Sequence, residues 1–382
     1  MEYRALGHTG LSVSAIALGC EGFTDKTPEA VRKDFDCAQD WGINFFDCYS
    51  SNPQLRSAFG EAMRGRREKF IVQGHICSAW ENGQYLRTRD PVRTERAFRD
   101  LLTRLGTDYI DVGMIHYIDA EEDFRAVFDG EIIQYAQRLK EKGRIRFLGL
   151  SSHNPHVASL AVGTGLIDVL LFAVNPCYDM QPAGENVEDL WADESYMKDL
   201  HNTDPERESL YELCARRGVG IDVMKTYGGG DLLSERNSPF GRAFTPVQCI
   251  EYALTRPAVA AVMIGCRTQA EIRAAVDWCA ATPQQRDYVP VMQGMKRFSW
   301  QGHCMYCGHC APCPQGINVA SVNKFLNLAK AQKQIPETVR EHYALLPHHA
   351  CECIACGSCE KRCPFGVPVI GAMKEAFSLF GC

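Results

Sequence analysis

The cysteines are the residues whose type and spacing say most about chemistry. The chain of 382 residues holds 19 of them, and more than half lie beyond residue 303. One motif has a gap of two residues between successive cysteines and consists of Cys304, Cys307, Cys310 and Cys313. A second motif has a last gap of three residues and consists of Cys353, Cys356, Cys359 and Cys363. Each motif is followed directly by a proline.

This spacing is typical of paired iron-sulfur clusters, in which three closely spaced thiolates bind one cubane and the remote cysteine before proline binds the other. We therefore predict two 4Fe-4S clusters. The expected ligands of the first cluster are Cys304, Cys307, Cys310 and Cys363. The expected ligands of the second are Cys353, Cys356, Cys359 and Cys313. A pair of zinc sites is the alternative, although it leaves the exchanged Cys-Pro partner unexplained. Cys351 and Cys382 lie outside both motifs and are expected to be free thiols.

The first three hundred residues alternate short apolar runs with amphipathic segments of helical period. The expected strands are 14–18, 44–47, 70–74, 110–115, 145–150, 169–174, 220–224 and 260–264. Eight strand-helix pairs predict an α/β fold, a (β/α)8 TIM barrel over residues 1–285. An open doubly wound sheet is the alternative. Residues 286–382 are expected to form a small helical, ferredoxin-like domain with both clusters.

In a parallel barrel, chemistry belongs at the carboxyl ends of the strands. Polar residues repeatedly end the apolar runs here. They are Asp47, His75, His116, Ser151, Ser152, Asn175, Lys225, Gly265 and Arg267. Two imidazoles beside a carboxylate can donate and accept protons near neutral pH, so we expect Asp47, His75 and His116 to be catalytic. Tyr49, two residues after Asp47, is a further candidate acid.

The barrel region resembles the aldo-keto reductases, and the whole chain resembles the iron-sulfur branch of that superfamily. The motifs that carry the resemblance are Tyr3-Arg4-x-Leu6-Gly7-x-Thr9-Gly10-Leu11, Asn44-Phe45-Phe46-Asp47, Leu105-Gly106-Thr107-Asp108-Tyr109-Ile110-Asp111 and Gly149-Leu150-Ser151-Ser152-His153-Asn154-Pro155. The resemblance implies hydride transfer between NADPH and a carbonyl by an Asp, Tyr, Lys and His tetrad. Asp47 and His116 match that tetrad. The Tyr position is Asn52 and the Lys position is His75, so the family's usual carbonyl reduction is in doubt.

The resemblance also implies that Ser151, Ser152 and Asn175 hold a nicotinamide amide and that Arg267 pairs with a phosphate. Lys225 leads into Gly228, Gly229 and Gly230, whose backbone amides could approach an anion near the end of the seventh strand. NAD(P)H is therefore a candidate cofactor, and a flavin stays open, because a flavin can couple two-electron to one-electron transfer.

The sequence predicts an oxidoreductase that acts on a small organic substrate in the barrel mouth, with electrons relayed through the clusters. A ferredoxin- or flavodoxin-type carrier is the expected electron partner. Two alternatives are an electron-transfer or redox-responsive protein with a non-catalytic barrel, and an NADPH-dependent carbonyl reductase with structural clusters. The net charge of −6 argues against nucleic-acid and membrane partners. The beginning of the sequence has no signal-peptide pattern, so we expect a cytoplasmic protein.

Overall fold

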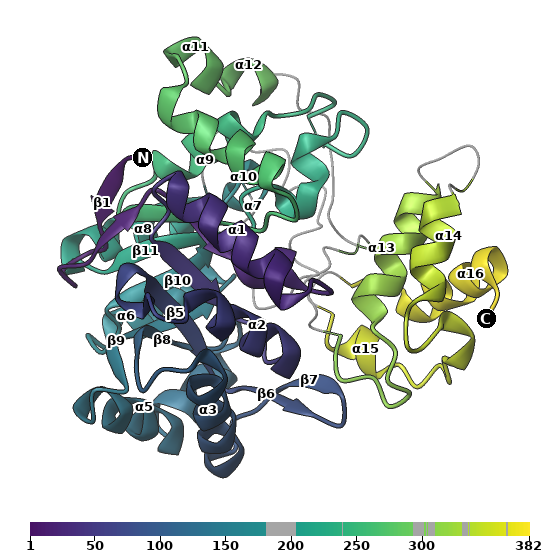
Figure 1. Cartoon of the computed structure of the whole chain (residues 1–382), viewed down its shortest axis with the longest axis horizontal. Coiled ribbons are helices and arrows are strands. Elements are labelled where there is room, and N and C mark those ends of the chain that lie inside the picture. The colour runs from purple at the N-terminus through teal and green to yellow at the C-terminus, as the bar shows by residue number, and fades with distance from the viewer. Residues whose placement is uncertain are drawn as a thin grey trace. The chain divides into compact units, whose positions relative to one another are not determined.

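The structure is a computed structural model. It describes residues 1–180, 204–238, 240–292, 302, 304, 310–330, 335, 337–363 and 366–382. The chain divides into two compact units. The first holds the barrel, and the second holds the C-terminal helices together with the hairpin tip Glu81–Leu86. Figure 1 draws the barrel in purple to green and the C-terminal helices in yellow.

The first unit is a closed barrel of eight parallel strands. The strands are β3 (Ile16–Gly19), β4 (Phe45–Cys48), β5 (Ile71–Ile76), β8 (Ile110–Ile115), β9 (Ile145–Ser152), β10 (Val169–Ala173), β11 (Gly220–Met224) and β12 (Val259–Ile264). They pair in chain order, and β12 closes the circle on β3 through the register Val262↔Ile16. The predicted barrel is therefore confirmed, and the open sheet is excluded because β3 and β12 are hydrogen-bonded neighbours.

Helices cover the outside of the strands. The longer ones are α1 (Pro28–Asp40), α2 (Pro53–Met63), α3 (Pro91–Leu105), α4 (Glu121–Phe128), α5 (Glu131–Glu141), α6 (Pro155–Gly163), α8 (Pro205–Arg217), α9 (Pro246–Leu254) and α10 (Gln269–Val276). Single turns are α7 (Pro176–Asp179), α11 (Pro283–Arg286) and α12 (Val289–Met292). The 3-10 turns are η1 (Cys20–Phe23), η2 (Arg67–Lys69), η5 (Gly228–Leu233) and η6 (Asp277–Ala280).

Many of these helices start with the same local device, a capping side chain followed by proline. Thr27 caps α1, Asn52 caps α2 and Asp90 caps α3, each by accepting a backbone N–H of the first turn. A side-chain oxygen satisfies an amide that has no partner within the helix, and proline at the first position needs no such partner. The caps therefore fix where each loop at the barrel mouth ends.

A short hairpin of β1 (Tyr3–Ala5) and β2 (Ser12–Ser14) lies at the amino-terminal ends of the barrel strands. Gly7 of its turn packs against the backbone before β11, and a Cβ there would lie 2.3 Å from the carbonyl oxygen of Gly218. A second hairpin, β6 (Ser78–Glu81) and β7 (Gln84–Arg87), follows β5. The first hairpin closes one end of the barrel and leaves the carboxyl ends of the strands for chemistry.

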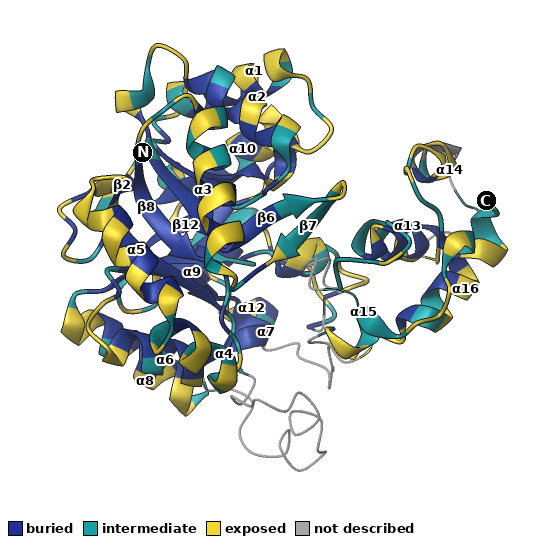
Figure 2. Cartoon of the chain, turned by 90° about the horizontal axis from the view of Figure 1, so that it is seen from below, coloured by how far each residue is buried: buried dark blue, intermediate teal, exposed yellow. Residues whose placement is uncertain are grey.

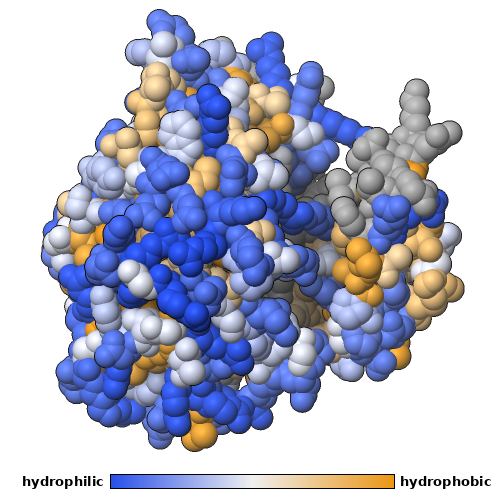
Figure 3. Space-filling model, viewed as in Figure 1, coloured by the Kyte–Doolittle hydropathy of each residue, from blue (hydrophilic) through white to orange (hydrophobic). Residues whose placement is uncertain are grey.

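The apolar core lies between the strands and the surrounding helices. Figure 2 shows buried strands at the centre and helices with exposed outer faces. Phe35 of α1 stacks on Phe46 of β4 at 4.4 Å between ring centroids and meets Phe59 of α2 edge-on. In the part of the chain that the structure describes, no helix is long and apolar enough to cross a membrane. On the face of the first unit seen in Figure 3, hydrophilic side chains predominate.

The second unit is built from α13 (Val319–Lys330), α14 (Glu337–Ala344), η7 (Ala350–Glu352), α15 (Ser358–Lys361) and α16 (Val369–Phe380). Val322, Leu326 and Met373 belong to its buried core. Cys351 and Cys382 form a disulfide with 5.7 Å between their Cα atoms. The expectation that they are free thiols is therefore wrong. The fold brings the end of α16 back to η7, 31 residues earlier in the chain, which sequence spacing does not reveal.

Candidate functional site

Three of the predicted catalytic residues form one hydrogen-bonded chain at the barrel mouth. Asp47 is the last but one residue of β4, His75 lies near the end of β5, and His116 directly follows β8. Nε2 of His75 lies 3.2 Å from Oδ1 of Asp47. Nδ1 of His75 lies 2.7 Å from Nδ1 of His116. All three side chains are buried.

The chain of contacts dictates which nitrogen atoms carry protons. A carboxylate only accepts, so Nε2 of His75 must donate to Asp47. In a neutral His75, Nδ1 is then an acceptor, and Nδ1 of His116 must donate to it. His116 can gain or lose a further proton only at Nε2. A positive charge formed there is stabilised by Asp47 through the intervening ring of His75.

Tyr49 lies beside this chain but is poorly suited to release a proton. Its ring centroid is 6.5 Å from that of His75. Burial raises the pKa of Tyr49 well above its usual range, and the negative charge of Glu21 raises it further. A phenol that holds its proton this tightly is a weak acid near neutral pH.

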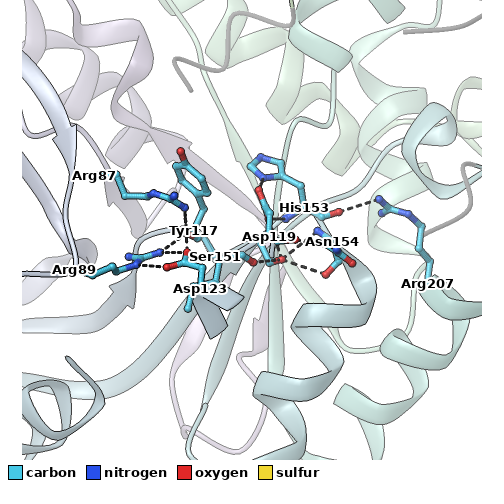
Figure 4. A network of polar contacts seen from close by, with 11 residues as sticks. Arg87, Arg89, Tyr117, Asp119, Asp123, Ser151, His153, Asn154 and Arg207 are labelled. Carbon is cyan, nitrogen blue, oxygen red and sulfur yellow. Dashed lines mark hydrogen bonds and ion pairs between the residues drawn. The ribbon is translucent and has the colours of Figure 1, made fainter. Parts of the chain in front are cut away.

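Arginines that the sequence reasoning missed hold the loop after β8 in place. Arg89 forms two hydrogen bonds to the carboxylate of Asp123, at 2.7 and 2.6 Å. The same guanidinium donates to the backbone oxygens of His116 (2.9 Å) and Tyr117 (2.7 Å). Arg87 also reaches Asp123 and lies over the ring of Tyr117. Figure 4 shows both arginines converging on Asp123. This clamp fixes the backbone that carries His116.

A second pair of titratable side chains connects the loop after β9 to the loop after β8. Nδ1 of His153 lies 2.9 Å from Oδ2 of Asp119, and the backbone N–H of His153 donates to Oδ1 of the same carboxylate at 2.7 Å. Arg207 donates to the backbone oxygen of His153. Figure 4 shows the rings of His153 and Tyr117 projecting to the same side of the network. The alternation of polar residues after apolar runs was the only sequence signal for this pair.

The side chains expected to hold a nicotinamide amide are engaged in structural hydrogen bonds. Oγ of Ser151 accepts the N–H of Tyr117 at 2.9 Å. Oγ of Ser152 donates to the backbone oxygen of Ile118 at 2.8 Å. Asn175 caps α7 through Oδ1, and its Nδ2 donates to the backbone oxygen of Lys225 at 2.8 Å. These groups order the strand ends.

The loops after β11 and β12 offer few unused amides to an anion. Lys225 has a left-handed backbone (φ 64), and Gly229 and Gly230 continue it with φ values of 74 and 103. The N–H groups of Gly228 and Gly230 donate to backbone oxygens of the same turn, those of Lys225 and Tyr227.

In the loop after β12, a backbone N–H group that could bind an anion instead donates to a carboxylate of the protein, that of Glu271. Arg267 and Gly265 lie just after this strand, and the N–H of Arg267 donates to Oε2 of Glu271 at 2.7 Å. Glu21 approaches Gly265, whose Cβ, if present, would lie 3.5 Å from Oε2 of Glu21. Negative charge therefore occupies the side of the mouth where a phosphate was expected.

In the second unit, four cysteines line one hollow. Cys313, Cys353, Cys356 and Cys359 line this small hollow together with apolar residues of α13 and α16. These are the four cysteines predicted to bind the second cluster. Within this unit the side-chain amide of Gln84 exchanges two hydrogen bonds with the backbone of Cys313, at 3.0 and 2.9 Å.

Of the four cysteines predicted to bind the first cluster, the structure describes three. Cys304, Cys310 and Cys363 pack against the core of the second unit, and Cys307 lies outside the described residues. Across the portions of the chain that are described, no group of three or more His, Cys, Asp or Glu side chains is arranged to hold a single metal ion.

Comparison with known proteins identifies the family. The family model described as "Aldo/keto reductase family" matches residues 15–248, which is most of the barrel. The chain therefore belongs to the aldo/keto reductase family. It is 31% identical over 161 residues to the uncharacterized oxidoreductase YqkF of Bacillus subtilis, covering 41% of this chain and 51% of that protein. It is 30% identical over 186 residues to L-galactose dehydrogenase of Arabidopsis thaliana, covering 45% and 56%.

A solved structure shares the fold. An aldo-keto reductase from Bacillus halodurans, in its holo form, superposes with a TM-score of 0.60 at 23% identity, covering 78% of this chain and 97% of that one. At this identity the likeness establishes the barrel fold alone. The chain spans about half the length of the curated relatives it matches.

Proposed function

We propose that this chain is an iron-sulfur oxidoreductase that reduces or oxidises a small organic substrate at Asp47, His75 and His116, with electrons passed through two 4Fe-4S clusters in the second unit. The observation that carries the proposal is the hollow lined by the four cysteines of one predicted ligand set. The spacing of these residues in the sequence and their gathering around one space are independent signs of the same site.

The lack of a single-ion site among the described residues is compatible with a cluster. A zinc ion requires four ligand atoms at about 2.3 Å from one point. A 4Fe-4S cluster spreads its four thiolates over four iron atoms, so its ligands need a larger shared space. When bound, a cluster of this kind supplies one-electron transfer. Cys313, Cys353, Cys356 and Cys359 would hold the second cluster, and Cys304, Cys307, Cys310 and Cys363 the first.

The barrel mouth supplies a proton. Reduction of a carbonyl to an alcohol consumes two electrons and two protons, one of which comes from solvent. His116 is placed to give the other proton at Nε2, and Asp47 stabilises the charged ring through His75. In the reverse direction the same nitrogen accepts a proton. General acid–base catalysis by such a group contributes about 10²- to 10⁴-fold to the rate.

The residues that differ from the family's tetrad have other tasks here. Asn52, at the position of the family's Tyr, caps α2 by accepting the N–H groups of Gln54 and Leu55. His75, at the position of the Lys, bridges Asp47 and His116. We assign the proton-donating role to His116, because Tyr49 holds its proton too tightly.

The barrel residues fit a nicotinamide cofactor poorly. Members of this family typically use NAD(P)H. Here the side chains expected to bind the nicotinamide amide form hydrogen bonds with the backbone instead, as Asn175 does with Lys225. The backbone N–H of Arg267 donates to Glu271 and is therefore not available to a phosphate. We therefore derive no step through NAD(P)H or a flavin, and propose a ferredoxin- or flavodoxin-type protein as the external electron carrier.

Anaerobic turnover assays separate this proposal from its two alternatives. The substrates are a panel of small aldehydes, ketones and sugars, because one relative is an L-galactose dehydrogenase. The electron donor is a chemically reduced viologen, NADH or NADPH. We expect viologen-driven turnover that is lost in Cys356→Ser and kept in the control Cys279→Ser, a cysteine of the barrel unit.

Two results would contradict the proposal. Turnover driven by NADPH and unaffected by Cys356→Ser identifies an ordinary family reductase with structural clusters. Clusters that viologen reduces, without consumption of any substrate in the panel, favour an electron carrier with a non-catalytic barrel.

A further inference from the structure

A polar pair crosses the interior of the barrel, one layer below His75. Gln73 of β5 and Asp222 of β11 are fully buried, and Nε2 of Gln73 donates to Oδ2 of Asp222 over 2.9 Å. β5 and β11 lie on opposite sides of the closed barrel. The interior of such a barrel is normally filled by bulky apolar side chains, so a carboxyl group and an amide there need an explanation.

The pair leaves two oxygen atoms unsatisfied. Oε1 of Gln73 and Oδ1 of Asp222 are buried without a hydrogen-bond partner in the described part of the protein. Both are acceptors when Asp222 is ionised, so neither can serve the other. A proton on Oδ1 of Asp222 makes this oxygen a donor, and Oε1 of Gln73 is the acceptor that lacks one. A single proton on Oδ1 of Asp222 therefore gives both oxygen atoms a hydrogen-bond partner.

The surroundings also favour the neutral carboxyl group. The register partners of Asp222 on the neighbouring strands are Leu171 of β10 and Ala261 of β12, both apolar. Gln73 is paired in register with Asp47 of the neighbouring strand β4, which brings this carboxylate close to the pair. Burial raises the pKa of Asp222 well above its usual range, and the charge of Asp47 raises it further.

We propose that Asp222 is a positioning residue that stays protonated in the working enzyme and pairs with Gln73 through two hydrogen bonds, one in each direction. The inference rests on the proposed function of Asp47, His75 and His116. Two buried carboxylates close to each other repel when both are ionised. A neutral Asp222 removes this repulsion from Asp47, which then accepts the proton of His75 and stabilises a charged His116.

Asp222→Asn tests the protonation state directly. The asparagine amide reproduces the protonated acid, because its oxygen accepts from Gln73 and its NH₂ group donates to Oε1. In protein labelled with 13C-aspartate, we expect the infrared spectrum at neutral pH to show the carbonyl band of a protonated carboxyl group. This band should be missing in Asp222→Asn. If that variant does not fold, a frequency shift of the band in Gln73→Leu gives the same assignment.

The pH dependence of stability gives a second, independent measurement. A carboxyl group whose pKa is raised on folding stabilises the protein at low pH, and this stabilisation is lost as the pH rises above the unfolded value near 3.8. Asp222→Asn removes the dependence. We expect its denaturant midpoint to match the wild type near pH 4 and to exceed it increasingly toward pH 7. Asp222→Ala, which has neither hydrogen bond, should be less stable at both pH values.

Two outcomes would overturn the proposal. One is a wild-type spectrum without a protonated carboxyl band that Asp222→Asn removes. The other is an Asp222→Asn variant that is less stable than the wild type at neutral pH. Neither measurement uses turnover, so failure of the proposed catalytic role would appear separately, as wild-type activity in variants of His116. If the proposal holds, Asp222→Asn also retains turnover that Asp222→Ala loses.

Discussion

At the scale of single residues, the distinctive feature of the barrel mouth is His75, which we propose stands at the position of the family's lysine. A lysine is a fixed positive charge, whereas His75 lies between Asp47 and His116 and contacts both. This exchange turns a group that activates a phenol into part of a proton chain that ends at His116. The presence of Asn52 at the proposed position of the family's tyrosine agrees with this exchange. Without the tyrosine as the acid, a lysine that lowers its pKa has no function.

Removal of either imidazole should stop proton transfer while leaving the cofactor sites intact. His116→Gln and His75→Gln are each expected to lower kcat by about 10²- to 10⁴-fold, because the first removes the donor and the second disconnects it from Asp47. The double variant should cost little more than either single one, since the residues act as a unit. Steady-state kinetics with the viologen donor provide the measurement.

The matched control is His8→Gln. His8 also lies beside an aspartate, with Nε2 3.2 Å from Oδ1 of Asp168, but it is exposed and belongs to the turn after β1. This variant should keep wild-type kcat. Wild-type turnover in both His116→Gln and His75→Gln would contradict the assigned roles.

At the scale of elements, the barrel strands and their helices could be predicted almost in full. Val169 to Ala173 is an apolar run of strand length, and Gly220 to Met224 is one apart from Asp222. Each is followed by a helix that starts with proline. Periodicity and capping are local signals, so the sequence displays them. Polar residues at strand ends were visible for the same reason.

The sequence predicted that His75 and His116 lie together near Asp47, but not which of their atoms are paired. The contact between Gln73 and Asp222, which are 149 positions apart, had no sequence signal. Such pairs depend on strand register, which only the closed barrel defines. The sequence also did not reveal the structural hydrogen bonds of Asn175 and Glu271. A side chain that caps a loop looks the same in sequence as one that binds a ligand.

The disulfide between η7 and the end of α16 is expected to stabilise the second unit. It closes a loop over 31 positions that contains the whole second cysteine motif. A disulfide that closes a loop of this size increases the unfolding free energy by about 3–4 kcal/mol. Cys382→Ser should therefore lower the unfolding free energy of this unit by about that amount in denaturant titrations without reductant, while Cys279→Ser should leave it unchanged. Alkylation of both thiols in the folded wild-type protein would refute the pairing.

At the scale of the whole molecule, the chain joins an aldo/keto reductase barrel to a cysteine-rich unit. The barrel provides buried proton-transfer groups, and the second unit provides a hollow with four thiols. A carbonyl reduction needs both protons and electrons. We therefore regard the barrel as the source of a proton and the cysteine-rich unit as the route of electrons.

The measurement that tests this account most directly is the iron and acid-labile sulfide content of anaerobically purified protein. We predict about eight iron atoms and eight sulfide ions per chain. Cys313→Ser and Cys356→Ser should each lower both values to about four, because both residues belong to one cluster, and Cys279→Ser should leave them unchanged. A wild-type protein without iron, or with zinc in place of iron and sulfide, would contradict the central claim.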